Sequence, residues 1–162
     1  YAKSGRGSSK ELWHGSVVWV HSNERAKYFY YSEPVMSEQQ VLFFLKSKVN
    51  NWSKIEDLQG IHIGETSHTA YPAFEEAEKK KILTIERAGN YSVLFERLLS
   101  GRIDAIPLEK KVAAYFLRTN LTKEKRDLIT FAPTIIQNRV FHLILSKKHQ
   151  NNKALIEFLI KV

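Results

Sequence analysis

The sequence predicts an α/β protein whose strands form a mostly parallel sheet flanked by helices. Short apolar runs alternate with longer amphipathic segments along most of the 162 residues. This alternation is typical of βαβ units, in which a helix connects two parallel strands. The 43% hydrophobic content is enough for one core or two small lobes. No apolar run approaches the length of about 18 residues that a membrane-spanning helix needs.

The first part of the chain begins with a loop and continues into a strand. Residues 1–12 carry Gly5 and Gly7 and predict a loop. The apolar run at residues 17–20 predicts a buried strand. Ser22 then introduces a turn into a short helix, which we expect to end at residues 32–34, where a proline follows Ser-Glu.

A polar stretch separates the first part of the chain from the second. Residues 41–45 form an unbroken apolar run and predict a buried strand, and the polar residues 46–51 after it predict a boundary between lobes. Ser53 and Glu56 have the spacing of a capping box, in which each side chain satisfies a free backbone donor at a helix start. We expect a short helix here that ends at Gly60.

Strands and helices alternate after this point. We expect strands at residues 61–63, 82–85, 103–106, 128–131 and 140–145, and helices at residues 72–80, 91–100, 108–117 and from Asn152 onward. The helix at residues 91–100 illustrates how these bounds are predicted. Asn90 can cap its start, and Gly101 can end it. Its apolar residues fall on one face, as a helix that packs on a sheet requires.

The composition excludes several classes of chemistry. The chain has no cysteine, so disulfides, thiolate catalysis and cysteine-bound metals are ruled out. The six histidines are scattered without metal-ligand spacing, and no phosphate-binding loop, dinucleotide fingerprint or nucleophile elbow occurs. We therefore expect no enzyme activity, no metal and no cofactor.

The net charge of +8 does not by itself indicate nucleic acid. The basic residues are dispersed, and their densest clusters, at residues 79–81, 110–111 and 123–126, lie near expected helix ends. Cations at helix C-termini oppose the negative end of the helix dipole. A solvated basic surface explains this pattern, and a nucleic-acid-binding domain is kept as an alternative, with salt-sensitive binding as its signature.

Three segments in the right order resemble the bacterial family 3 solute-binding proteins, which serve amino-acid uptake transporters. The first segment runs from Ser22 and Arg25 to the Ser-Glu-Pro at residues 32–34. The second, at residues 55–64, reads IEDLQGIHIG, and the third, at residues 98–105, reads LLSGRIDA. The match extends from about residue 13 to the end of the chain.

The resemblance implies a periplasmic-binding-protein-like fold of type II, with two α/β lobes joined by two crossing segments. Residues 1–46 would form part of lobe one, residues 47–135 lobe two, and residues 136–162 the return to lobe one. Lobe one would be incomplete, because the first strand, helix and following strand of the family have no counterpart here. A signal peptide would already have been removed, and the protein would be a periplasmic monomer.

The resemblance also implies ligand contacts in the first lobe. Arg25 occupies the family position that binds a ligand carboxylate, and its guanidinium fork suits that partner; a surface ion pair is the alternative. Ser22 would donate a hydrogen bond to the ligand or cap the local turn. Trp19 stands in a stretch where the family has small polar residues, and it would offer an aromatic face to the ligand or pack in the core.

Further contacts are implied on the second lobe. Thr69 matches a position that donates to the ligand carboxylate, although it would also serve as a helix N-cap. His68 would narrow the pocket or lie in an exposed loop, and Tyr71 would line the cleft or pack. Glu109 stands where the family commonly has an aspartate for the ligand ammonium group; a solvated carboxylate in the first helical turn is its alternative.

The expected function follows from these contacts. A ligand that bridges Arg25 on one lobe to Thr69 and Glu109 on the other would stabilise a closed state, which the membrane permease of an ABC transporter would recognise. The ligand would be an amino acid or a related carboxylate. Three alternatives remain: the ligand-sensing domain of a receptor kinase or cyclase, a degenerate module that binds no ligand, and the nucleic-acid-binding domain considered above.

Overall fold

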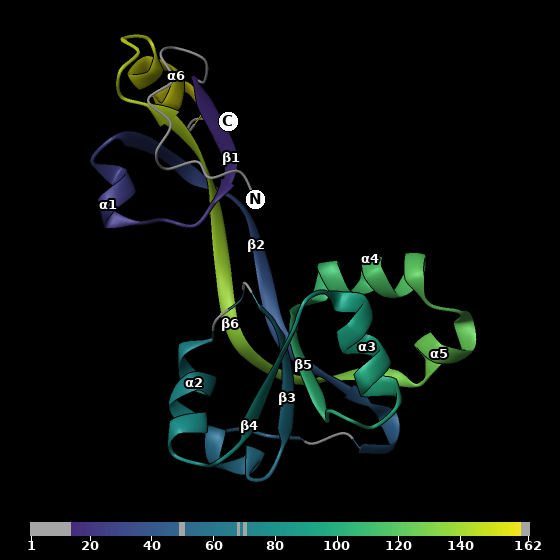
Figure 1. Ribbon diagram of the computed structural model, residues 1–162. Coiled ribbons are helices and arrows are strands. Elements are labelled where there is room, and N and C mark those ends of the chain that lie inside the picture. The colour runs from purple at the N-terminus through teal and green to yellow at the C-terminus, as the bar shows by residue number, and fades with distance from the viewer. Residues whose placement is uncertain (1–13, 49–50, 68, 70, 160–162) are drawn as a thin grey trace. The chain divides into compact units, whose positions relative to one another are not determined.

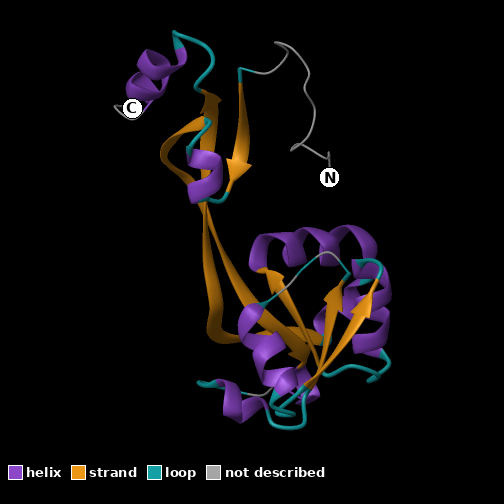
Figure 2. Ribbon diagram, turned by 60° about the vertical axis from the view of Figure 1, so that its left-hand side comes forward, coloured by secondary structure: helices purple, strands orange, loops and turns teal. Residues whose placement is uncertain are grey.

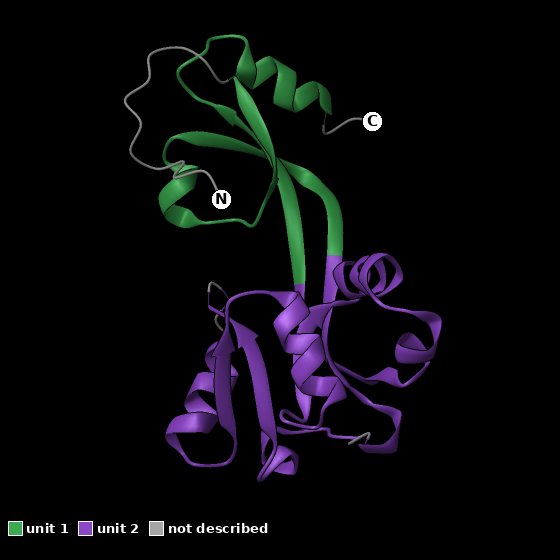
Figure 3. Ribbon diagram, turned by 45° about the vertical axis from the view of Figure 1, so that its right-hand side comes forward, with its two compact units in different colours: residues 1–37, 139–162 green, residues 38–138 purple. Residues whose placement is uncertain are grey.

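The computed structural model describes residues 14–48, 51–67, 69 and 71–159. The chain divides into two compact units, Tyr1–Ser37 with Arg139–Val162 and Glu38–Asn138 (Figure 3). Two long strands, β2 (Phe29–Leu45) and β6 (Ile129–Ser146), belong to both units. The division differs from the predicted boundaries at 46/47 and 135/136, because the chain passes between units within these strands and not in the polar stretch after β2.

The second unit contains a mixed sheet with a parallel centre. Its strands lie in the order β2, β5 (Ala105–Glu109), β3 (His62–Thr66) and β4 (Thr84–Ala88). β3 pairs in parallel with both β4 and β5, whereas β2 pairs antiparallel with β5 (Figures 1 and 2). The α/β fold class predicted from the alternation of strands and helices is confirmed.

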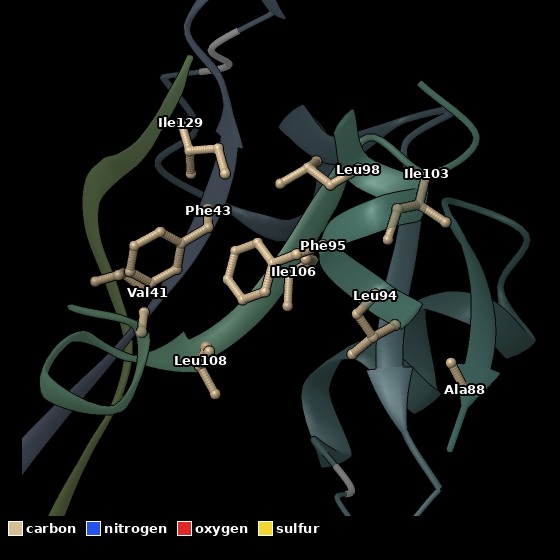
Figure 4. Close-up of a cluster of buried hydrophobic side chains, with 11 residues drawn as sticks. Val41, Phe43, Ala88, Leu94, Phe95, Leu98, Ile103, Ile106, Leu108 and Ile129 are labelled. Carbon is tan, nitrogen blue, oxygen red and sulfur yellow. The ribbon is translucent and has the colours of Figure 1, made fainter. Parts of the chain in front are cut away.

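Helices cover both faces of this sheet. On one face lies α2 (Pro72–Lys79), and on the other lie α3 (Tyr91–Leu99) and α4 (Lys110–Asn120) (Figure 1). Phe95 and Leu98 of α3 pack with Phe43 and Ile106 of the strands in a fully apolar core (Figure 4). On the α2 face, Phe74 packs in a second core. A short helix that the sequence did not predict, α5 (Lys123–Asp127), follows α4.

The capping box predicted for Ser53 and Glu56 is not formed, and contacts to a different carboxylate take its place. The Asp57 carboxylate, and not that of Glu56, accepts hydrogen bonds from the backbone N–H and the hydroxyl of Ser53 and from the N–H of Lys54. These bonds lower the pKa of Asp57. The helix they cap, η2 (Ile55–Leu58), is a 3-10 helix, whose tighter winding brings Asp57 back over its start. A second 3-10 helix, η1 (Lys46–Lys48), follows β2.

The first unit contains β1 (Gly15–Trp19), α1 (Asn23–Ala26) and α6 (Asn152–Leu159) together with the ends of β2 and β6. β1 pairs antiparallel with β6, and its register is interrupted between Ser16 and Trp19. Val17 and Val18 lie in this interruption and are 59% and 51% exposed. The predicted burial of this strand is therefore wrong, because the irregularity turns both side chains outward.

The two long strands correct three further predictions. Helix α1 ends at Ala26, and Pro34 lies inside β2, because the aromatic run at residues 28–31 favours a strand over a continued helix. The strands expected at residues 128–131 and 140–145 are one continuous strand, β6.

No helix among the described residues is long and apolar enough to cross a membrane.

Candidate ligand-binding site

Arg25 is held in a defined position on the first unit, and no carboxylate of the described residues pairs with it. Its Nη1 donates to the carbonyl oxygen of Val20 at 3.1 Å and to the hydroxyl oxygen of Tyr31 at 3.4 Å. Its guanidinium also lies 4.3 Å from the centre of the Trp19 ring. Within the described residues Arg25 makes no ion pair, so the surface ion pair considered for it is not formed there. Its Nη2 and Nε donors make no hydrogen bond to any other described residue.

Ser22 and Trp19 orient this arginine. The Ser22 hydroxyl accepts a hydrogen bond from the backbone N–H of Arg25 at 3.5 Å and caps α1, which is one of the two roles predicted for it. Trp19 is half-buried under the guanidinium and is not part of either apolar core. Its aromatic face is thus occupied by Arg25, a cation–π contact that fixes the cation near the surface.

Three aromatic residues beside Arg25 were missed as candidates. The ring centres of His21 and Tyr31 lie 4.6 Å apart, and those of Tyr31 and His142 lie 5.6 Å apart. They come from β2, β6 and the loop after β1, which no spacing rule connects. One indirect signal was present in the sequence: Tyr31 lies inside the family-like segment that contains Arg25.

The second unit places Thr69 and Tyr71 in the connection between β3 and α2. Thr69 is not the N-cap of α2, since its hydroxyl donates to the Thr66 carbonyl at 3.2 Å and its side chain is hydrogen-bonded to that of Thr66. Tyr71 occupies the cap position without a side-chain cap bond. Its side chain is 3% exposed, and its hydroxyl donates to the Pro107 carbonyl at 3.0 Å. Of the two predicted roles for Tyr71, the structure favours packing.

Glu109 ends β5 and precedes α4. Its carboxylate accepts a hydrogen bond of 2.8 Å from the amide of Gln40, which is 1% exposed. Glu109 is therefore a half-buried, oriented group and not the solvated carboxylate considered as the alternative. It lies at the same end of the parallel strands as Thr69, the carboxyl end, where ligands bind in open α/β sheets.

Two residues remain: the predicted candidate His68 and Asp104 of the third family-like segment. His68 lies outside the described residues. Asp104, from the third family-like segment, accepts a hydrogen bond from the backbone N–H of His62 at 3.0 Å and forms an ion pair of 3.6 Å with Lys48. Since His62 belongs to the second family-like segment, Asp104 joins the two segments structurally.

A buried carboxylate near the Thr66–Thr69 turn was not predicted. Glu65 of β3 is 1% exposed, and burial raises its pKa to about 7. Arg87 lies 4.0 Å away and opposes this shift, while Glu75 and Glu78 of α2 add to it. Among the described residues no group of three or more side chains has the arrangement of a metal site.

Comparison with known proteins places the fold. No family model and no curated protein matches the chain. Among solved structures, the second substrate-binding domain of a putative amino acid ABC transporter from Streptococcus pneumoniae matches with a TM-score of 0.66 and 21% identity over 88% of this chain and 61% of that one. Substrate-binding domain 2 of GlnP from Lactococcus lactis, in an open conformation, matches with a TM-score of 0.64 and 17% identity over 88% and 58%.

A third match is ArgBP from T. maritima in its holo form, with a TM-score of 0.58 and 21% identity over 88% of this chain and 58% of that one. The chain thus spans about three fifths of the length of these structures. The first two are named as substrate-binding domains. The predicted fold is confirmed: the chain has the α/β fold of amino-acid substrate-binding domains of transporters.

Proposed function

We propose that the protein is an extracytoplasmic, non-enzymatic solute-binding protein that captures an amino acid or related carboxylate for an ABC-type uptake transporter. The observation that carries this proposal is the guanidinium of Arg25, which is oriented by Val20, Tyr31 and Trp19 and has no carboxylate partner among the described residues. An oriented guanidinium with donors that no described residue uses is a suitable partner for a ligand carboxylate.

The geometry of Arg25 fits a carboxylate. One edge of the guanidinium, through Nη1, is used to hold the side chain in place. The remaining donors include two parallel N–H groups, on Nη2 and Nε, along another edge of the planar guanidinium. Their spacing matches the two oxygens of a carboxylate. The side chain therefore needs little reorganisation to bind, which lowers the entropic cost of capture.

On the second unit we propose that Thr69 and Glu109 complete the site. The two residues lie at the carboxyl end of the parallel strands, and Gln40 keeps the Glu109 carboxylate oriented. A carboxylate so held suits the ammonium group of an amino acid. A ligand that contacts both units would stabilise a closed form, because only that form makes both sets of contacts. The transporter permease would then be the partner that recognises it.

A thermal-shift screen tests the proposal. The protein is heated in the presence of the common amino acids and small carboxylic acids, each in large excess. A ligand at a hundred times its Kd stabilises the folded state by about 2.7 kcal/mol, so at least one compound is expected to raise Tm by several degrees. If no compound changes Tm, the proposed function is wrong.

A further inference from the structure

The aromatic residues beside Arg25 form a nitrogen-rich cluster, which we call the histidine cluster: His21, Tyr31 and His142. Tyr31 lies between the two imidazoles, and the rings of His21 and His142 are 6.4 Å apart. The Tyr31 hydroxyl accepts a hydrogen bond from Arg25 and keeps its own proton to donate. The cluster therefore adjoins the arginine that we propose binds the ligand.

The tautomer of His142 is set by its backbone partner. Its Nδ1 lies 2.8 Å from the carbonyl oxygen of Ser32, and a carbonyl only accepts, so Nδ1 carries the proton. Nε2 is then a bare acceptor in the neutral ring and becomes a donor when the ring takes up a second proton. His21 has ring contacts but no hydrogen bond or ion pair within the described part of the chain.

Among the described residues, no acidic side chain forms an ion pair with Arg25, His21 or His142. Helix α1 contributes Arg25 and one acid, Glu24, which is exposed and makes no ion pair among the described residues. On β2, Glu33 is exposed and likewise makes no ion pair there, and the charged residue within β6, Arg139, is another cation. Proton uptake by either imidazole therefore adds positive charge beside a guanidinium that has no counter-ion within the described part of the chain, a cost that an anionic ligand removes.

We propose that the histidine cluster is a second anion subsite beside Arg25, so that the captured ligand is a small molecule with two acidic groups, such as an acidic amino acid or a dicarboxylic acid. This inference rests on the proposed function and narrows its ligand class. One carboxylate pairs with Arg25, and the other accepts hydrogen bonds from the Tyr31 hydroxyl and from a protonated imidazole. Capture of the ligand is then coupled to proton uptake.

Matched acid and amide probes test this subsite. Isothermal titration calorimetry is performed with L-glutamate, L-glutamine, L-aspartate, L-asparagine, succinate, succinamate and L-arginine at pH 5.5, 6.5 and 8. We expect at least one acid to bind at least about tenfold more tightly than its amide at pH 5.5. Its affinity is expected to fall by about tenfold toward pH 8, because one linked proton changes affinity by up to tenfold per pH unit.

Two variants test whether the pH dependence of the affinity arises in the histidine cluster. The double change His21→Gln and His142→Gln is expected to remove the pH dependence, whereas His149→Gln, at a histidine of the same unit that stacks on His14, should leave it unchanged. Thermal melting checks that each variant folds. The wild-type pH series tests the subsite even if the double variant is unstable.

The outcomes separate this inference from the proposed function. If an amide or L-arginine binds at least as tightly as the acids at every pH, and binding is lost in Arg25→Gln, the second subsite is wrong and the proposed function stands. An acid preference that does not change with pH also overturns the subsite. If none of the seven probes binds, the second subsite is wrong, and the thermal-shift screen of all common amino acids decides the proposed function separately. If binding of a probe survives Arg25→Gln unchanged, the proposed role of Arg25 fails together with the subsite.

Discussion

The amide of Gln40 on β2 donates a hydrogen bond of 2.8 Å to the carboxylate of Glu109 on β5. The two residues are register partners in the antiparallel pair, so the bond crosses directly from strand to strand. Gln40 is 1% exposed, which makes this a buried polar contact between the strand that passes between units and the strand that carries a candidate ligand residue. The Glu109 carboxylate is thereby held in a fixed orientation.

Loss of the Gln40 amide should destabilise the protein measurably. Gln40→Ala removes a buried hydrogen bond to a carboxylate, and such bonds contribute about 1.5–3 kcal/mol. We expect the free energy of unfolding in urea to fall by about 2 kcal/mol. Gln39→Ala is the matched control, since the Gln39 side chain is exposed and accepts a hydrogen bond from Lys110. Equal losses in the two variants would contradict a structural role for the buried amide.

A side chain at Gly64, in the second family-like segment, is expected to destabilise the protein. A Cβ at this position would lie 2.4 Å from Cδ1 of Ile103 and 2.9 Å from Cδ2 of Leu94, so Gly64→Ala overpacks the core. Overpacking costs about 1–3 kcal/mol, and we expect a loss of unfolding free energy in that range. Gly89→Ala is the control, because a Cβ there meets nothing within 4 Å. A Gly64→Ala variant as stable as the wild type would show that this packing is loose.

Glu65 should make the stability of the protein fall as pH rises. Burial raises its pKa from 4.5 to about 7, so the folded state binds this proton more tightly than the unfolded state. The resulting stabilisation is complete below pH 4.5, is lost as pH rises to about 7, and does not change further above that value.

Glu65→Gln removes this titration and keeps the size of the side chain. We expect the variant to exceed the wild type by about 2 kcal/mol in unfolding free energy at pH 8, and to lose that advantage near pH 4.5. Urea unfolding at several pH values measures the difference. Glu76→Gln is the control, at an exposed residue of α2 that pairs with Lys80. If the difference in unfolding free energy between Glu65→Gln and the wild type stayed constant from pH 4.5 to pH 8, the raised pKa of Glu65 would be contradicted.

The sequence predicted the second unit well because its elements are determined locally. Asn90 and Gly101 delimit α3 as expected: the Asn90 side chain accepts from the Val93 N–H, and Gly101 has a φ of +73°. Strands β4 and β5 lie about two residues later than predicted, because their apolar runs begin in the preceding turns.

The candidate site was harder to predict because its contacts are non-local. The environment of Arg25 depends on Tyr31 and His142, which lie on two different long strands, and no periodicity in the sequence joins them. Glu109 was identified by its position after the third family-like segment. Gln40, which orients it, was not identified, because the sequence does not show that β2 pairs with β5. The exposure of Val17 and Val18 depends on an irregular register, which apolar content alone does not reveal.

Arg25 carries the central claim, and a direct affinity measurement tests it best. The compound that gives the largest thermal shift is titrated calorimetrically into the wild type, Arg25→Gln and Arg25→Lys. As the control, Arg118→Gln makes the same charge change at an exposed residue of α4.

Loss of a charge-assisted, bidentate contact costs about 2–4 kcal/mol, so we predict that Arg25→Gln weakens binding by roughly a hundredfold or more. Arg25→Lys keeps the positive charge but loses the planar, two-pronged donor geometry of the guanidinium. We expect its affinity to lie between that of the wild type and that of Arg25→Gln. Arg118→Gln is expected to match the wild type. An Arg25→Gln variant that folds and binds with wild-type affinity would contradict the account.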